Sequence, residues 1–296
     1  MSWFQRTREL LTQRPNNYLE SQKKPRVFLA GLNYYDETPL IVERAGAIHS
    51  IYYGGTGSGK TSSMAFALEQ AIHAGENVFV VDLKGTDYIL YAAMCAAAKR
   101  CGIDPPKYFT NRHGHSTYLL PVLKTDWWKH GLSSREKADA LAAAFGLADP
   151  QSHDWWSDAA EYLFSFVLND VDPDEIDTFV KLADLIERRK RDLPKELRNA
   201  SLHAALLTQR LASVAMLNPD SNTPSEALEH ASDLQDLALR GKQSLFCVSL
   251  CSNRSQKISS TIARFLGRAL LLAADALEPR ERGNTWVAYD EAQRAL

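Results

Sequence analysis

The sequence predicts an α/β protein built on a mainly parallel sheet, with an all-α domain inserted into it. Apolar runs at Val78–Val81 and Ser244–Leu250 have the composition of strands that are buried on both faces. Strand-like and helical patterns alternate between residues 48 and 110, and this alternation is typical of parallel strands with helices on their faces. From about Ser133 to Leu239 the pattern changes to Ala- and Leu-rich helical segments, which form the predicted insertion.

Each element is expected from its own local pattern. The first residues predict a short amphipathic helix and a polar linker. Before the insertion, strands are expected at 27–29, 40–42, 48–53, 78–81 and 107–110, and helices at 62–74 and 88–99. Inside it, helices are expected at 133–147, 154–168, 176–191, 194–217 and 224–239. Asp172-Pro173-Asp174-Glu175 predicts the start of the third, since it offers a cap, a proline and acids in the first turn. A strand at 244–250, a helix at 255–276 and a strand ending at Asp290 follow.

These elements divide the chain into four predicted segments. Residues 1–25 are the N-terminal helix and linker, and residues 26–126 are the first part of the α/β core. Residues 127–239 are the all-α insertion domain, and residues 240–296 return to the core.

A complete phosphate-binding motif lies between the expected strand at 48–53 and the expected helix at 62–74. Gly54-Gly55-Thr56-Gly57-Ser58-Gly59-Lys60-Thr61 fits G-x-x-x-x-G-K-[ST] at every position. Glycines let the backbone N–H groups turn toward phosphate oxygens, and the helix N-terminus adds positive potential. The motif therefore predicts ATP binding, with Lys60 on the β- and γ-phosphates and the Thr61 hydroxyl on Mg²⁺. The predicted nucleotide-binding residues are Gly55, Thr56, Gly57, Ser58, Gly59, Lys60, Thr61 and Ser62.

The last expected strand ends in two carboxylates. Trp286-Val287-Ala288-Tyr289 is followed directly by Asp290 and Glu291, the pattern of a Walker B strand. Asp290 is the predicted Mg²⁺ ligand, and Glu291 is the predicted general base that polarises the attacking water. Together with Lys60 as a catalytic residue, this pair predicts a RecA-like P-loop NTPase core that hydrolyses ATP.

Composition limits the other functions. The net charge is −2, so any contact with DNA must be local, and Arg188-Arg189-Lys190-Arg191 is a candidate, with a solvated helix end as the simpler interpretation. Lys84, which follows the strand at 78–81, either contacts nucleotide or a neighbouring subunit or is a solvated loop residue. No stretch has the ~18 apolar residues that a membrane span needs, which predicts a cytoplasmic protein.

Several stretches, in order, resemble the coupling-protein branch of the FtsK/HerA superfamily, the ATPases of conjugation and type IV secretion. Besides the two nucleotide motifs, Asp82-Leu83-Lys84-Gly85 resembles the family's D-P-K-G motif, with Leu83 in place of proline. Leu120-Pro121-Val122-Leu123 stands where the family has an N-P-L element. Asp154-Trp155-Trp156-Ser157-Asp158-Ala159-Ala160 resembles the W-x-x-x-A segment that opens its all-α domain.

The resemblance implies a homo-oligomer, a hexameric ring in that family, which uses ATP to move DNA or a DNA–protein substrate. It also implies secretion-system or relaxase-like protein partners. Two alternatives stay open: a HerA-like translocase that processes DNA ends, and a nucleotide-binding adaptor that recruits partners through the all-α domain with little hydrolysis. The resembled motors carry a sensor residue and a trans-acting arginine after Walker B. This sequence ends at Leu296, so we expect slow hydrolysis by this chain alone.

Overall fold

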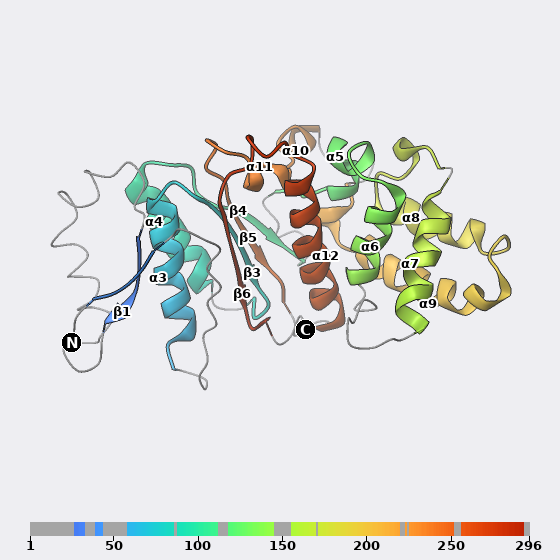
Figure 1. The fold of residues 1–296 in the computed structure, drawn as a ribbon, viewed down its shortest axis with the longest axis horizontal. Helices are drawn as coiled ribbons and strands as arrows, with labels where there is room; N and C mark the ends of the chain where they lie inside the picture. The colour runs from blue at the N-terminus through green and yellow to red at the C-terminus, as the bar shows by residue number, and fades with distance from the viewer. Residues whose placement is uncertain are drawn as a thin grey trace. The chain divides into compact units, whose positions relative to one another are not determined.

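The chain forms two compact units, one of Met1–Glu76 with Ile89–Pro105 and the other of Asn77–Tyr88 with Pro106–Leu296. Figure 1 shows the ribbon. This computed structural model describes residues 27–32, 39–43, 58–85, 88–111, 118–144, 155–169, 171–219, 223, 225–251 and 256–292. The expected N-terminal helix, the expected strand at 48–53 and motif residues 54–57 lie outside the described residues.

The first unit contains two strands and two helices among its described residues. β1 (Val27–Leu32) pairs antiparallel with β2 (Pro39–Glu43), at the two positions where strands were expected. α3 (Lys60–His73) packs along α4 (Ile89–Cys101). Both helices bury alanines, whose small side chains allow helices to approach closely: Ala67 and Ala71 on α3, and Ala97 and Ala98 on α4.

The second unit contains a four-stranded sheet, and its strands all run parallel. The strands are β3 (Asn77–Asp82), β4 (Lys107–Thr110), β5 (Leu245–Ser249) and β6 (Thr285–Asp290), arranged in the order β4-β5-β3-β6 (Figure 1). β3 and β5 are buried along their whole lengths, which explains their continuous apolar runs. The predicted α/β class with a parallel sheet is confirmed.

Between β4 and β5 the described residues contain helices and connecting turns but no β-strand. The helices are η1 (Val122–Lys124), α5 (Asp126–Lys129), α6 (Ser134–Ala144), α7 (Trp155–Leu168), η2 (Pro173–Glu175), α8 (Phe179–Arg189), η3 (Lys195–Leu197), α9 (Arg198–Ala212), η4 (Ala215–Leu217), α10 (Ser225–Glu229) and α11 (Gln235–Ala238). α12 (Gln256–Asp275) follows β5. Its Phe265 ring contacts Phe179 of α8 at 5.1 Å and Trp128 of α5 at 5.8 Å between ring centroids, so α12 shares a core with the helical segment.

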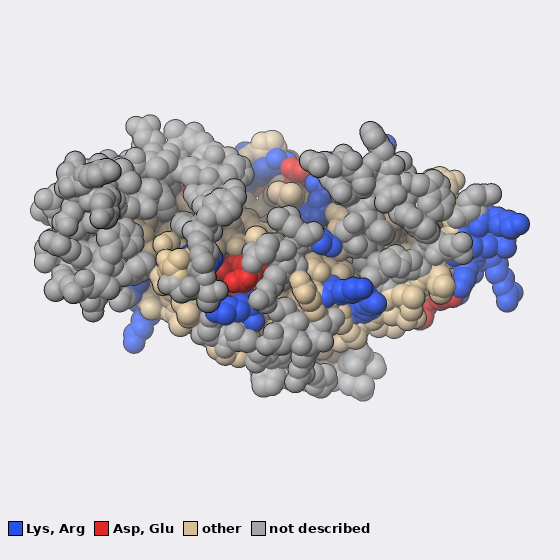
Figure 2. Space-filling model, turned by 90° about the horizontal axis from the view of Figure 1, so that it is seen from below, with Lys and Arg blue, Asp and Glu red and all other residues tan. Residues whose placement is uncertain are grey.

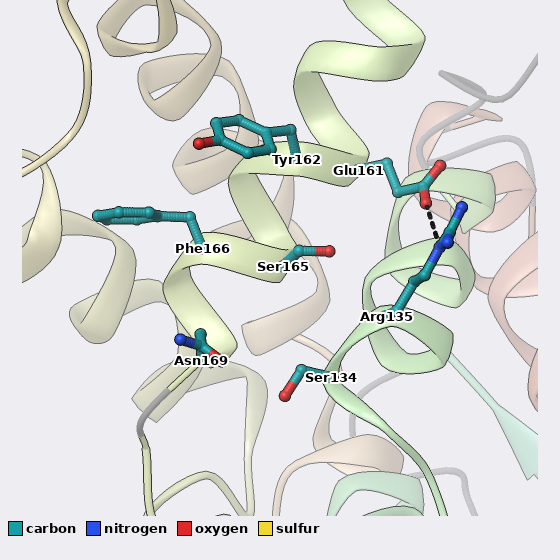
Figure 3. Close-up of a pocket in the computed structure, with 7 residues that line it drawn as sticks. All are labelled: Ser134, Arg135, Glu161, Tyr162, Ser165, Phe166 and Asn169. Carbon is teal, nitrogen blue, oxygen red and sulfur yellow. Dashed lines mark ion pairs between the residues drawn. The ribbon is translucent and has the colours of Figure 1, made fainter.

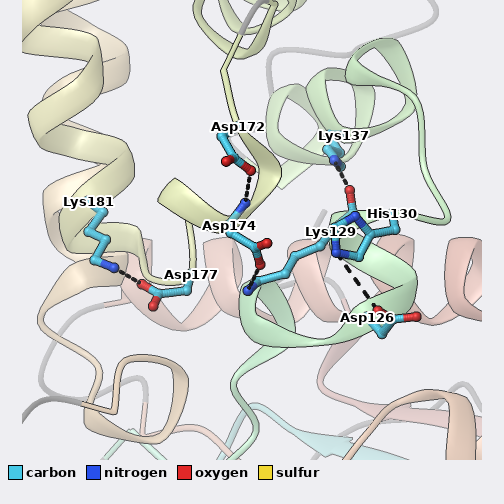
Figure 4. Close-up of polar contacts among 8 residues, drawn as sticks. All are labelled: Asp126, Lys129, His130, Lys137, Asp172, Asp174, Asp177 and Lys181. Atoms are coloured by element: carbon cyan, nitrogen blue, oxygen red, sulfur yellow. Dashed lines mark hydrogen bonds and ion pairs between the residues drawn. The ribbon is translucent and has the colours of Figure 1, made fainter.

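The expected helix at 194–217 is observed as η3, α9 and η4, and two further expected helices also differ from the observed ones. The segment expected as 176–191 does not start at Asp172-Pro173. There the Asp172 side chain caps one short 3₁₀ turn, by accepting from the Asp174 N–H at 3.0 Å (Figure 4). α8 begins only at Phe179, where the Thr178 hydroxyl accepts from the Lys181 N–H at 3.3 Å. A cap pattern shows where a helix can begin, and long-range contacts choose between two competing caps.

Those long-range contacts involve α5. Lys129 Nζ lies 2.6 Å from Asp174 Oδ1 and holds the 3₁₀ turn against α5 (Figure 4). The same hydrogen bond lowers the pKa of the Asp174 carboxyl. Lys137 of α6 donates to the Lys129 carbonyl at 2.8 Å, which satisfies a backbone acceptor at the end of α5.

The expected helix at 224–239 is also interrupted. It consists of α10 and α11, separated by a non-helical stretch. There the Ser232 N–H donates to the Leu119 carbonyl at 2.8 Å, and the Asp233 carboxylate accepts from the Gln235 N–H at 2.9 Å and from Trp127 Nε1 at 2.7 Å. These bonds to groups outside the helix replace the helical ones.

We expect Gly267→Ala to destabilise the packing of α12 on β6. A Cβ atom at Gly267 would lie 2.3 Å from the Tyr289 hydroxyl oxygen but 3.5 Å from its ring carbon Cζ. Tyr289 directly precedes Asp290, and burial raises the pKa of the Tyr289 phenol to about 12. Overpacking of this kind costs about 1–3 kcal/mol, measurable as a lower midpoint in urea unfolding.

The control for this clash is the double variant Gly267→Ala with Tyr289→Phe. Phenylalanine removes the one atom that clashes, so the double variant should be more stable than Gly267→Ala alone. Removing the Tyr289 hydroxyl loses only its long hydrogen bond to the Ala263 carbonyl, at 3.4 Å. Purely additive effects of the two substitutions would show that the clash is absent.

Candidate nucleotide-binding site

The first part of the candidate site is the start of α3. Gly59 has a φ of 87°, a left-handed conformation that glycine adopts without strain, and it directly precedes the first helical residue, Lys60. Ser58 and Gly59 are exposed, and Lys60, Thr61 and Ser62 are half-buried. The first turn of α3 contains no acidic residue, and Gly59 has no side chain to cap it. This is the electrostatic setting that a helix N-terminus needs to receive an anion.

The second part is a row of polar residues where the parallel strands end. Thr110 of β4 is in register with Ser249 of β5, Ser249 with Asp82 of β3, and Asp82 with Asp290 of β6. We call these four residues the carboxyl-edge row. All four are buried, with 3–6% of each residue exposed. Open α/β sheets bind their ligands at this edge.

Asp290 and Glu291 lie at the end of β6, where the strand stops at Asp290. The Asp290 carboxylate accepts from the Glu291 N–H at 3.1 Å. Glu291 has a φ of 58°, although it is not glycine, and it is half-buried. A left-handed non-glycine residue costs about 1–2 kcal/mol, and such residues concentrate at functional sites.

The turn after β3 is held against the same edge. Asp82 Oδ1 accepts from the backbone N–H groups of Lys84 at 2.9 Å and of Gly85 at 3.0 Å. The Leu83 N–H donates to the Asp290 carbonyl at 3.3 Å, which ties this turn to the end of β6. The D-x-K-G pattern therefore describes a rigid turn in which the aspartate orients the lysine backbone. Sequence reasoning placed Asp82 in this motif but assigned a possible role only to Lys84, and the hydrogen bonds show that Asp82 is the residue that orders the turn.

Asn111 is a second residue that the sequence did not single out. Its Oδ1 accepts from the Cys251 N–H at 3.0 Å, and its Nδ2 donates to the Ser259 hydroxyl at 3.2 Å. Ser259 in turn donates to the Cys251 carbonyl at 3.3 Å. This network joins the ends of β4 and β5 to the start of α12. A single asparagine after a short strand carries no local signal of such a role.

The predicted site residues are divided between the two units. Lys60, Thr61 and Ser62 belong to the first unit, and Asp290 and Glu291 belong to the second. Predicted site residues Gly55, Thr56 and Gly57 lie outside the described residues. Among the residues that are described, no group of three or more His, Cys, Asp and Glu side chains is arranged to hold a metal ion by itself.

A groove elsewhere in the second unit does not belong to this site. It lies on α6 and α7 and has a volume of about 630 Å³ (Figure 3). Its lining residues are Ser134, Arg135, Glu161, Tyr162, Ser165, Phe166 and Asn169. Arg135 and Glu161 face each other there at 3.5 Å. None of the lining residues comes from the sheet.

The described helices also bear on membrane attachment. Within the described ranges, no helix is both long enough and apolar enough to cross a bilayer.

Comparison with known proteins identifies the family. The sequence model of the type IV secretion-system coupling protein DNA-binding domain matches residues 37–218, which is more than half of the chain. No curated protein and no solved structure matches the chain. The family match covers the first nucleotide motif, β3, β4 and most of the helical segment, so it confirms the resemblance seen in the sequence. The chain belongs to the type IV secretion-system coupling protein DNA-binding domain family.

Proposed function

We propose that the chain is a P-loop ATPase that couples ATP hydrolysis to the movement of DNA, or of a DNA–protein substrate, in conjugation or type IV secretion. The family match supports the coupling function. The complete motif Gly54–Thr61 supports nucleotide binding. We also propose that the domains are bounded as the sequence suggests, with residues 127–239 as the all-α insertion into a RecA-like core.

The observation that carries this proposal is the end of β6. A carboxylate that is only 6% exposed, Asp290, stands at the carboxyl edge of a parallel sheet, and the next residue carries a second carboxylate in a left-handed conformation. The Asp290 carboxylate is held in place by the Glu291 N–H, and a carboxylate oxygen is a ligand that Mg²⁺ accepts. A purely structural strand end needs neither a second acid nor the strained backbone at Glu291.

The chemistry of the residues in each unit suits one part of ATP–Mg²⁺. Lys60 and the N-terminal turn of α3 offer positive charge for the phosphates, and the Thr61 hydroxyl and the Asp290 carboxylate are oxygen ligands of the kind that Mg²⁺ prefers. Bound Mg²⁺ neutralises charge that develops on the phosphates. Glu291 would accept a proton from the attacking water. Assembly into a ring would complete the site, since motors of this kind supply an arginine in trans.

We expect Lys60→Ala to weaken ATP–Mg²⁺ binding. A hydrogen bond to a charged group contributes about 1.5–3 kcal/mol, so the dissociation constant should rise roughly 10- to 100-fold. Isothermal titration calorimetry of the full chain measures this directly.

The matched control is Lys99→Ala. Lys99 is exposed in the last turn of α4, in the same unit as Lys60, and its loss should leave the affinity unchanged. If the unaltered chain bound no nucleotide at millimolar ATP, the proposal would be wrong. Tight binding with no hydrolysis under any condition would favour the adaptor alternative.

A further inference from the structure

Positive charge is concentrated in one short segment of the helical part of the chain, which we call the basic turn (residues 188–198). It contains six cationic side chains and two acidic ones, Asp192 and Glu196, although the whole chain has a net charge of −2. The cationic residues are Arg188, Arg189, Lys190, Arg191, Lys195 and Arg198. Figure 2 shows Lys and Arg side chains gathered at the end of the view where Figure 1 places α8 and α9.

Two of the six cations have structural partners. Arg189 donates to the carbonyls of Phe166 at 3.2 Å and Asn169 at 2.8 Å, so it satisfies the C-terminal end of α7. Lys190 lies 3.6 Å from Glu187. The Arg189 hydrogen bonds fix the end of α8 to α7 and therefore hold the basic turn in place.

The other four cations, Arg188, Arg191, Lys195 and Arg198, are all exposed. Within the described part of the chain, none of the four takes part in an ion pair. The four side chains therefore place positive charge on the surface without forming an ion pair within the described part of the chain.

The helix dipole favours two of these four. Arg188 lies in the last turn of α8, and Arg191 directly follows its C-cap residue, Lys190, where a cation is also favoured. Lys195 and Arg198 are instead the first residues of η3 and α9, where the dipole disfavours a cation, and the first turn of α9 contains no acidic residue. Repulsion between neighbouring cations adds to this cost. Local stability therefore does not account for Lys195 and Arg198, and an anionic partner would.

We propose that the basic turn binds the phosphate backbone of DNA without reading its sequence. The proposal rests on the proposed function, in which DNA is the partner. Guanidinium groups bind phosphate through two parallel hydrogen bonds, and three of the four exposed cations are arginines. The family description names a DNA-binding domain, and the basic turn lies within the matched residues. The contact needs no general positive charge, which agrees with the acidic chain.

The test is fluorescence anisotropy of a labelled 30-nucleotide single strand with the full chain, at several salt concentrations. The variant is Arg191→Gln, Lys195→Gln and Arg198→Gln together. Each lost phosphate contact should reduce the slope of log affinity against log salt by about 0.7. Three contacts should lower the slope by about 2 and the affinity roughly 100-fold at 0.1 M salt.

The control has the same charge change at exposed cations elsewhere, Lys99→Gln, Lys124→Gln and Arg280→Gln. It should keep the slope of the unaltered chain.

An equal loss of DNA affinity in both triple variants, or no DNA binding by the unaltered chain, would overturn the proposal. The proposal would also be overturned if the basic-turn variant lost binding to phosphatidylglycerol vesicles but kept its DNA binding, because the turn would then bind lipid. If the triple variant melts early, Arg191→Gln and Lys195→Gln are measured singly, each with an expected slope change of 0.7.

ATP titration of the same samples separates this inference from the proposed function. Variants of the basic turn should bind ATP as the unaltered chain does, and Lys60→Ala should not. ATP binding with no effect of the basic turn on DNA affinity would overturn the inference alone. DNA binding through the basic turn without any ATP binding would instead overturn the proposed ATPase.

Discussion

Glu291→Gln is expected to slow ATP hydrolysis roughly 10²- to 10⁴-fold, the usual contribution of a positioned general base. Glutamine keeps the size of the side chain and can keep the backbone bond from the residue 291 N–H to Asp290 Oδ1, at 3.1 Å. ATP affinity should therefore change little. Single-turnover assays with the chain in excess over radiolabelled ATP measure even slow hydrolysis, with DNA present to stimulate the reaction.

Two further variants isolate the role of Glu291. Glu229→Gln removes an exposed carboxylate on α10 and should leave the rate unchanged. Asp290→Asn should instead reduce the Mg²⁺ dependence of ATP binding, since Asp290 is the proposed metal ligand. Hydrolysis that survives in Glu291→Gln would remove this residue from the reaction and point to another base.

Gly85→Ala is expected to cause a large loss of stability. Gly85 has a φ of 60°, and a Cβ atom there would lie 2.8 Å from the backbone C and O atoms of Leu250 and 2.9 Å from the Cys251 nitrogen. Backbone atoms cannot turn aside as a side chain can. The left-handed conformation costs alanine about 1–2 kcal/mol, and overpacking adds about 1–3 kcal/mol. The melting temperature should fall roughly 5–15 °C.

The matched control is Gly241→Ala, in the same unit. Gly241 has a φ of 82°, but a Cβ atom there meets nothing within 4 Å. Gly241→Ala should show only the cost of the left-handed backbone conformation. The difference in melting temperature between the two variants therefore measures the clash with Leu250. Equal melting temperatures would mean that the turn after β3 moves away from β5 without penalty. The turn also carries Lys84 and contacts Asp290, so Gly85→Ala should reduce ATP affinity as well.

The sequence by itself determined the features that depend on residues close together along the chain. The apolar runs of β3 and β5 marked strands buried on both faces, and β4 and β6 were found at nearly their observed positions. The glycine-rich motif before α3 and the carboxylates after β6 were also local signals, because a phosphate loop and a strand end are each short stretches of chain. Their chemical roles stay predictions. The structure starts α3 at Lys60, two residues before the expected start.

Only the tertiary structure decided which distant residues meet. Thr110 and Ser249 join Asp82 and Asp290 in one row because pairing between strands sets their register, and no local pattern encodes it. Local rules allowed a helix start at Asp172. The structure begins α8 at Phe179, whose N–H donates to the side chain of Asn218 at 2.8 Å, thirty-nine residues away. Local propensities are worth about a kilocalorie per mole, and contacts that bury residues from several elements outweigh them.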